Sequence, residues 1–251
     1  MPSIKDHPAP PPADWQAAGE RYHSLSGYFR RTFGHRVWKV SVDAGLACPN
    51  VDGTVGRGGC IFCNVLSFSP SRRLAARPIC VQIGEAARRL RERNRAEQFV
   101  AYFQPATNTY ASVERLRALY EEALAQPGIC GLAIGTRPDC VPDDVLDLLA
   151  ELSRRTWLLL EYGLQSIHER SLRWMDRGHG YAAFLDAVDR SRRRGIRIGA
   201  HAILGVPGET REDMRATARE VARLGLHSVK LHNLHAVRNT RLAAWRLWSL
   251  T

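Results

Sequence analysis

Short apolar runs rich in β-branched and aromatic residues alternate along the chain with longer segments that repeat apolar positions at helical spacing. The apolar runs predict six strands, over residues 37–43, 98–103, 131–134, 157–162, 196–204 and 228–231. The helical patterns cover residues 22–33, 81–95, 112–125, 142–154, 181–194 and 211–224. Two of these helices open with start signals, since Ser112 and Thr210 each precede acidic residues. This repetition of strand and helix predicts a parallel sheet with right-handed crossovers.

Polar and glycine-rich segments follow or lie on the predicted strands, where ligands bind in parallel sheets. They are a cysteine segment at 48–63, residues 104–110, residues 135–139, Glu161 to Ser166, Gly205 to Glu209, and the group Lys230, His232 and His235. Each of them alone could be a turn or a helix cap, and Asp139 is a candidate cap for the helix that begins near Pro142. Together they predict one polar mouth at the carboxyl edge of the sheet.

The length and composition favour one α/β domain. With 251 residues and 45% apolar residues, the chain can bury a sizeable core. Residues 1–21 are rich in proline and alanine and predict a poorly ordered leader ahead of a core at 22–251. We find no apolar run long enough for a membrane span and no signal peptide, so we expect a cytoplasmic protein whose six cysteines are metal ligands or buried thiols.

The formal charge of +11 comes from 36 basic and 25 acidic residues. Most of the basic residues are arginines, which form bidentate contacts with phosphates. A nucleic acid is therefore a plausible partner. The alternative is that the arginine clusters are solvated helix faces.

Three cysteines, Cys48, Cys60 and Cys63, lie on one glycine-rich connection directly after the first predicted strand. Three thiolates can hold three irons of a [4Fe-4S] cluster and leave the fourth iron open to a small chelating molecule. A redox dithiol or a zinc site remains the alternative, with His35 or Cys80 as the fourth zinc ligand. The spacing of the three cysteines favours the cluster.

The other cysteines, Cys80, Cys130 and Cys140, lie singly in or beside apolar stretches. We expect them to be small buried hydrophobic residues.

Several of these motifs resemble the radical S-adenosylmethionine (SAM) superfamily, and within it the YhcC/YtqA-like group related to the radical domain of the elongator catalytic subunit. The resemblance runs from about Tyr22 to about Thr240. Its motifs are the segment from Asp43 to Asn50 with the Cys60 and Cys63 pair, residues 102–110 and 135–139, Glu161 to Ser166 with Arg177 and His179, Ile203 to Glu209, and Lys230 to His232. The fold that it implies is a partial (β/α)6 barrel.

The resemblance implies a [4Fe-4S] cluster on the three cysteines, with the amine and carboxylate of SAM on the open iron. An electron passed through the cluster, from a donor such as a flavodoxin or ferredoxin, would cleave SAM to a 5′-deoxyadenosyl radical. The strand end with Ile203, Gly205, Pro207 and Gly208 would contact the adenine. Asn108, Glu161 and Gln165 would reach the ribose or methionine end.

The group resemblance also implies a substrate. It points to transfer RNA (tRNA), in which a carboxymethylaminomethyl group on the wobble uridine is trimmed to aminomethyl. A radical SAM enzyme for a small molecule or protein, and a noncatalytic metal-stabilised nucleic-acid-binding protein, are the alternatives.

Similar proteins carry a segment beyond the point that corresponds to Thr251. We therefore expect the barrel to be truncated at its carboxyl end. The sixth strand would lack its full covering helix, and apolar surface would be exposed around Trp245 and Trp248.

Overall fold

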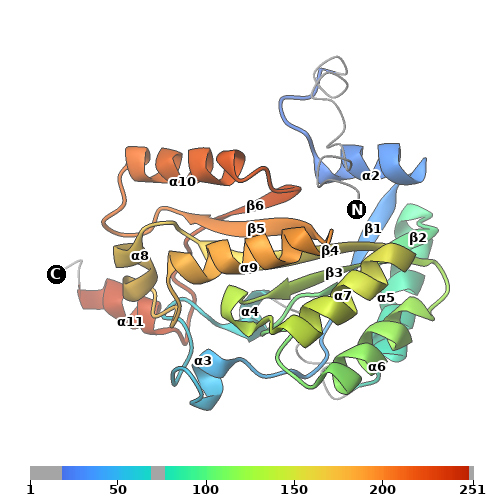
Figure 1. Cartoon of the computed structure of the whole chain (residues 1–251), viewed down its shortest axis with the longest axis horizontal. Coiled ribbons are helices and arrows are strands. Elements are labelled where there is room, and N and C mark those ends of the chain that lie inside the picture. The colour runs from blue at the N-terminus through green and yellow to red at the C-terminus, as the bar shows by residue number, and fades with distance from the viewer. Residues whose placement is uncertain (1–18, 69–76, 249–251) are drawn as a thin grey trace.

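The computed structural model describes residues 19–68 and 77–248, and its centre is one curled sheet of six parallel strands (Figure 1). The strands follow one another in sequence order across the sheet. They are β1 (Val37–Val42), β2 (Gln98–Phe103), β3 (Ile129–Thr136), β4 (Trp157–Gln165), β5 (Arg197–Leu204) and β6 (Ser228–Asn233). All six predicted strands are therefore confirmed, and the architecture is a partial (β/α)6 barrel.

The six predicted helices are also present. They are α2 (Leu25–Phe33), α5 (Ile79–Asn94), α6 (Val113–Leu124), α7 (Asp143–Arg155), α9 (Tyr181–Arg193) and α10 (Arg211–Arg223). Ser112 caps α6 by accepting a hydrogen bond from the Arg115 amide, and Thr210 forms a capping box with Asp213 at the start of α10. Short elements that the sequence did not predict are α3 (Pro49–Asp52), α4 (Val65–Phe68), the 3-10 turn η2 (Pro138–Cys140), α8 (Glu169–Trp174) and α11 (Arg241–Trp248).

The main core lies between the outer face of the sheet and the helices α5, α6, α7 and α9 (Figure 1). On β2, Phe99, Ala101 and Phe103 point to this face and are fully buried. The Phe103 ring meets the Tyr120 ring of α6 edge to face, at 5.2 Å between centroids. Because side chains alternate along a strand, the residues between them must face the barrel interior.

A second apolar cluster closes the interior at the amino ends of the strands. There Phe29 of α2 meets the Trp157 ring of β4 edge to face, with the ring centroids 5.1 Å apart. Val37, Val100, Tyr102, Ala133 and Leu159 complete this cluster. Helix α2 thus seals the amino end of the barrel, and access to the interior is from the carboxyl end.

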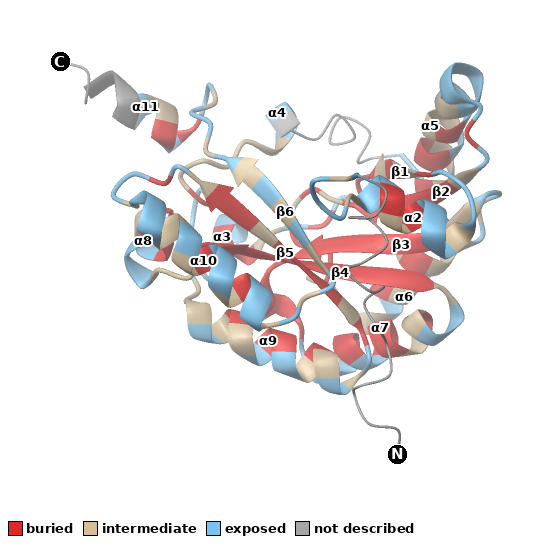
Figure 2. Cartoon of the chain, turned by 90° about the horizontal axis from the view of Figure 1, so that it is seen from above, coloured by how far each residue is buried: buried red, intermediate tan, exposed pale blue. Residues whose placement is uncertain are grey.

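The last strand is exposed on its outer face in the part of the chain that the structure describes. Val229 and Leu231 are 47% and 61% exposed, whereas Lys230 and His232 alternate with them and are half-buried. Figure 2 shows β6 in tan and pale blue, whereas the inner strands β3 and β4 are red. The outer face of β6 is therefore exposed among the described residues. The side chains of Trp245 and Trp248 lie outside the described residues, as does most of the predicted leader at 1–21.

No helix within residues 19–68 and 77–248 has the length and apolar character needed to cross a membrane.

Candidate active site

The connection after β1 folds back on itself and brings the three cysteines of the predicted cluster site together. Cys48 is the residue before α3, and glycines in the left-handed region, Gly58 at φ 80° and Gly59 at φ 75°, then reverse the chain. The amide of Cys63 donates to the Cys60 carbonyl at 3.0 Å. As a result, Cys48, Cys60 and Cys63 line one cavity of about 940 Å³ at the mouth of the barrel.

Side chains from distant segments fix this cysteine loop. Asn50 donates to the Asp176 carbonyl at 2.6 Å and to the Cys60 sulfur at 3.5 Å. Gly56 packs so closely on Asn50 that a Cβ there would lie 2.5 Å from the Asn50 Oδ1. Arg241 of α11 pairs with the Asp176 carboxylate at 2.6 Å and donates to a carbonyl of the loop. The loop is therefore held in place by the segment after α8 and by α11.

Arg177 places a positive charge against the cysteines. Its side chain is 7% exposed, and its Nη1 donates to the Cys60 sulfur at 3.1 Å. Its Nη2 donates to the Gly163 carbonyl and lies 3.0 Å from the Nε2 of His179. Burial and the Arg177 charge lower the pKa of His179, so this ring is neutral at pH 7 and its Nε2 can accept the hydrogen bond. The sequence motif that contains Arg177 did not indicate this role.

The sulfurs lie close enough to influence one another. Burial, together with the charges of Cys60 and Cys48, raises the pKa of Cys63 to about 12. Three thiolates confined in this way repel each other, so the arrangement favours a cationic centre that binds all of them. An iron-sulfur cluster fits this donor set, because each thiolate would bind a different iron.

The two candidates for a fourth zinc ligand lie elsewhere. His35 precedes β1 and Cys48 follows it, so a strand about 20 Å long separates them. Cys80 belongs to α5, where its amide donates to Glu122 of α6. Among residues 19–68 and 77–248, no three or more His, Cys, Asp or Glu side chains form a site for a single metal ion.

The structure gathers some of the predicted SAM contacts at the cavity and not others. Glu161, Gln165 and Ile203 line the same cavity as the cysteines. Gly205, Pro207 and Gly208 form the turn after β5 and are not among the lining residues.

Asn108 is fully buried beside the mouth rather than in it. Its side-chain amide donates to the carbonyls of Phe103, Pro105 and Gly135 at 2.9 to 3.1 Å. Asn108 therefore holds the connection after β2 against the end of β3.

Below the cysteines, the interior face of the strands carries a layer of polar and charged side chains. The Glu161 carboxylate binds Lys39 through one oxygen and His201 through the other, each at 3.1 Å. Burial raises the pKa of Glu161, but the His201 hydrogen bond and the Lys39 charge outweigh it and hold that pKa far below its usual range. Glu161 is thus ionised at pH 7.

Lys39 and His201 were missed by sequence analysis. The signal that marks them is a charged or polar residue in the middle of an otherwise apolar strand, at a position that alternation turns inward.

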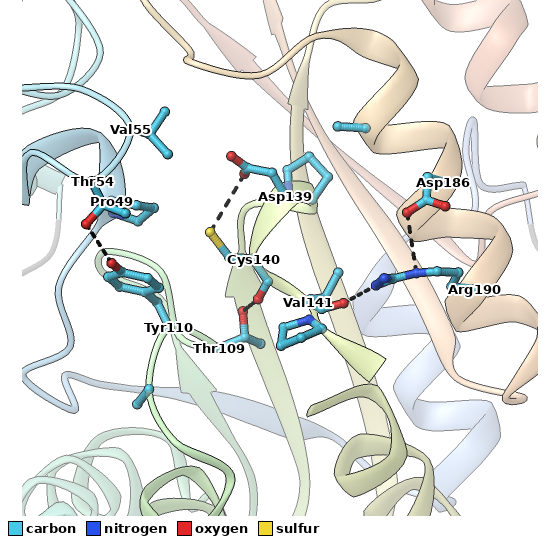
Figure 3. Close-up of a pocket in the computed structure, with 14 residues that line it drawn as sticks. Pro49, Thr54, Val55, Thr109, Tyr110, Asp139, Cys140, Val141, Asp186 and Arg190 are labelled. Carbon is cyan, nitrogen blue, oxygen red and sulfur yellow. Dashed lines mark hydrogen bonds and ion pairs between the residues drawn. The ribbon is translucent and has the colours of Figure 1, made fainter. Parts of the chain in front are cut away.

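A second cavity, of about 590 Å³, lies beside the cysteine loop and shares no lining residue with the first (Figure 3). On its walls the hydroxyls of Thr54 and Tyr110 are 2.9 Å apart, and Arg190 pairs with Asp186. These groups bind one another rather than pointing into the space (Figure 3). We therefore assign the site to the larger cavity.

Asp139, on the wall of the second cavity, does not cap the following helix. Its carboxylate accepts two hydrogen bonds from the buried Arg137, at 2.9 and 2.7 Å, and the residue before α7 is Pro142, which makes no side-chain cap. The alternative interpretation of Asp139 as a helix cap is therefore wrong, because the charge of Arg137, which is 4% exposed, needs a partner.

The three other cysteines differ in burial. Cys140 is buried, as expected for a small hydrophobic residue, whereas Cys80 and Cys130 are half-buried.

The known proteins that this chain is similar to agree with the family that its motifs resemble. The family model of the radical SAM superfamily matches residues 53–221. YtqA of Bacillus subtilis (strain 168) is 41% identical over 229 residues, which cover 91% of this chain and 71% of YtqA. YhcC of Escherichia coli (strain K12) is 42% identical over 223 residues, 88% of this chain and 71% of YhcC.

Among solved structures, the archaeal Elp3 of Methanocaldococcus infernus superposes with a TM-score of 0.60 at 18% identity. The match covers 85% of this chain and 49% of that one, so this chain spans about half the length of the solved Elp3. The likeness extends the agreement from sequence to fold.

The family model covers most of the barrel, and two relatives align along nearly the whole chain. The cysteine loop at the carboxyl end of the sheet is where such a barrel binds its ligands. This chain therefore belongs to the radical SAM superfamily, whose enzymes use a [4Fe-4S] cluster and S-adenosylmethionine.

Proposed function

We propose that Cys48, Cys60 and Cys63 hold the cluster and that this enzyme trims a carboxymethylaminomethyl group on the wobble uridine of tRNA to aminomethyl. The observation that carries the proposal is the trio of cysteines at the open end of a cavity whose floor is charged. A net charge of +11 favours a polyanionic substrate, and tRNA is the one that the group resemblance suggests. Such an enzyme would work in the cytoplasm with a flavodoxin or ferredoxin as electron donor.

When bound, the cluster and SAM supply a 5′-deoxyadenosyl radical that abstracts a hydrogen atom from the substrate. The residues of the chain bind and orient the two cofactors. Gln165 and Ile203 line the cavity beside the cysteines. The turn at 205–208 does not line the cavity, but it follows the end of β5 directly and would offer backbone groups to the adenine at the rim. Glu161 reaches the ribose or methionine end from below, and Asn108 acts through the backbone that it holds.

The cavity has room for this chemistry. Its volume of about 940 Å³ is at the upper end of the range for small-molecule sites. A nucleobase within tRNA must leave its stack to enter an enclosed site, and the wobble base lies in a single-stranded loop where this costs little. The open carboxyl end of the barrel admits such a base, because α2 closes the other end.

The reaction balances with SAM as a two-electron oxidant. The substrate amine loses two electrons and two protons across the bond between nitrogen and the carboxymethyl carbon, which becomes an imine. Conversion of bound SAM to methionine and 5′-deoxyadenosine would take up the two electrons and one proton, and the second proton would pass to solvent. Water then hydrolyses the imine, so the aminomethyl nitrogen stays on the uridine and the two-carbon unit leaves as glyoxylate.

The test is anaerobic reconstitution with iron and sulfide, followed by assays for 5′-deoxyadenosine and glyoxylate and by mass analysis of tRNA nucleosides. We expect both products in equal amounts with tRNA that carries the carboxymethylaminomethyl group. Cys60→Ala should abolish both products, and Cys80→Ala, a cysteine outside the cavity, should keep them. Formation of 5′-deoxyadenosine without any change in tRNA would contradict the substrate assignment, and retained activity in Cys60→Ala would contradict the ligand assignment.

A further inference from the structure

Lysine is rare in this chain, and its placement is unusual. Of 36 basic residues only three are lysines, Lys5, Lys39 and Lys230. Two of these lie inside the barrel and approach one ring from the two edge strands of the sheet. The Nζ of Lys39 is 4.3 Å from the centroid of the Tyr102 ring, and the Nζ of Lys230 is 5.3 Å from it. A protein that uses arginine almost everywhere has two compact ammonium groups on the interior face of its barrel, and one of them, Lys230, lines the active-site cavity.

The two lysines differ in how their charges are balanced. Lys39 pairs with Glu161 at 3.1 Å, and the other oxygen of that carboxylate is bound to His201. Lys230 donates to the Tyr102 hydroxyl at 3.3 Å, and in the described part of the chain no carboxylate lies within ion-pair distance of it. Glu161 therefore binds Lys39 directly and acts on Lys230 only through space, so that, among the described residues, Lys230 has no directly paired carboxylate.

His232 lies two residues further along β6, on the same face as Lys230. Its Nε2 is buried and, among the described residues, has no hydrogen-bond partner. Burial, followed by the neighbouring His201 and Lys230, lowers the pKa of His232 to about 4, so the ring is neutral at pH 7. A neutral ring with a hydrogen on Nε2 is a donor that lacks an acceptor, and such a buried group costs about 1–3 kcal/mol when it is left unsatisfied.

Both residues line the cavity that the cysteines line. Lys230, which has no carboxylate within ion-pair distance among the described residues, and the Nε2 of His232 lie at adjacent inward positions, and an anionic acceptor would satisfy both. A single ammonium beside one hydrogen-bond donor matches a monoanion such as a carboxylate better than a phosphate dianion.

We propose that Lys230 and His232 form a subsite that binds a carboxylate of the substrate at the floor of the cavity. This rests on the proposed function, in which the group to be removed ends in a carboxylate. Held at the floor, that carboxylate leaves its neighbouring methylene, the carbon that loses hydrogen, on the side of the cavity that faces the cysteines. Lys230 and His232 then select carboxymethylaminomethyluridine over aminomethyluridine, the product.

The scarcity of lysine gives a direct test. Protein grown with [ε-13C]lysine should show three lysine signals in NMR spectra of the reconstituted, SAM-loaded holoenzyme, and Lys39→Arg and Lys230→Arg variants assign them. We expect sodium acetate to shift the Lys230 signal saturably, while sodium chloride at equal ionic strength does not. Lys5, which lies outside the described residues, is the internal control.

His232→Gln should weaken the acetate response about tenfold, as expected for loss of one hydrogen bond to a charged group. The nucleoside 5-carboxymethylaminomethyluridine should shift the Lys230 signal, and 5-aminomethyluridine should not. The subsite is wrong if acetate does not shift the Lys230 signal, or if the Lys230 and Lys5 signals shift in parallel.

The experiments distinguish a failure of the carboxylate subsite from a failure of the proposed function. If tRNA is trimmed but the Lys230 signal ignores every carboxylate, the subsite is wrong and the proposed function stands. If acetate shifts Lys230 but tRNA is not trimmed, the proposed function is wrong, and the subsite then serves another carboxylate substrate.

Discussion

The arginine beside the cysteines gives a quantitative prediction about the reduction potential of the cluster. Arg177 is 7% exposed and donates to the Cys60 sulfur at 3.1 Å. Reduction adds one negative charge to a cluster held by that sulfur, and a nearby guanidinium stabilises this charge. Arg177→Met removes both the positive charge and the hydrogen bond, so we expect the potential of the variant to be lower.

The size of the shift follows from the geometry. At a separation of about 5 Å between the guanidinium and the added charge, and an effective dielectric constant of about 20, the attraction is about 3 kcal/mol. A tenfold change in a one-electron equilibrium corresponds to about 59 mV, so this attraction is worth about 130 mV. Arg177→Gln keeps a donor but no charge, and we expect about half of that decrease.

The assay is an anaerobic redox titration of reconstituted protein, followed by electron paramagnetic resonance of the reduced cluster. Arg170→Gln is a matched control, since it removes an arginine charge that pairs with Asp213 on the surface. Equal potentials in the wild type, Arg177→Met and Arg170→Gln, at full iron content, would refute the reasoning. They would mean that Cys60 does not hold the metal centre that accepts the electron.

Three further predictions concern the cluster, the polar layer and the sheet. Cys60→Ala should lose the brown colour of the reconstituted cluster, whereas Cys80→Ala should keep it, as absorption spectra will show. Glu161→Gln should lower the free energy of unfolding by about 3–5 kcal/mol, because it leaves the Lys39 ammonium inside the barrel without its carboxylate partner. The depressed pKa of Glu161 means that its stabilisation is present above the unfolded pKa of about 4.3 and is lost as pH falls towards the folded pKa, so urea unfolding of the variant should lack this acid-side decline. Gly131→Ala places a Cβ 2.5 Å from a backbone oxygen of β4 and should destabilise by about 1–3 kcal/mol, whereas Gly84→Ala, in an open position of α5, should not destabilise at all.

The strands could be predicted closely because their signal is local. Strand β2 begins and ends where its apolar run does, at Gln98 and Phe103. Strand β3 is longer than its predicted core at both ends, and β4 continues to Gln165, because pairing with neighbouring strands extends the ladder beyond the apolar run. The short helices α3, α4 and α8 were missed, since four to six residues are too few to show helical periodicity and depend on contacts with distant segments.

In the candidate site, too, some residues could be predicted from local sequence and others could not. The cysteines were found because their spacing is itself the signal. Lys39 and His201 were not, because they join Glu161 across 122 and 40 residues of sequence and no local motif links them. Only the register of the strands shows that these side chains share one interior face.

That register also explains why the floor of the cavity is charged at all. Each strand of a barrel fills the interior with every second residue, and near the amino ends these residues are Val37, Val100 and Leu159, packed under α2. One step further along the strands the inward residues become Lys39, Glu161 and Lys230, although apolar side chains there would extend the core at no desolvation cost. If the interior of the barrel served stability alone, we would expect apolar side chains to fill this level as well. The change from apolar to charged side chains at this level therefore marks where the structural part of the interior ends and the binding part begins.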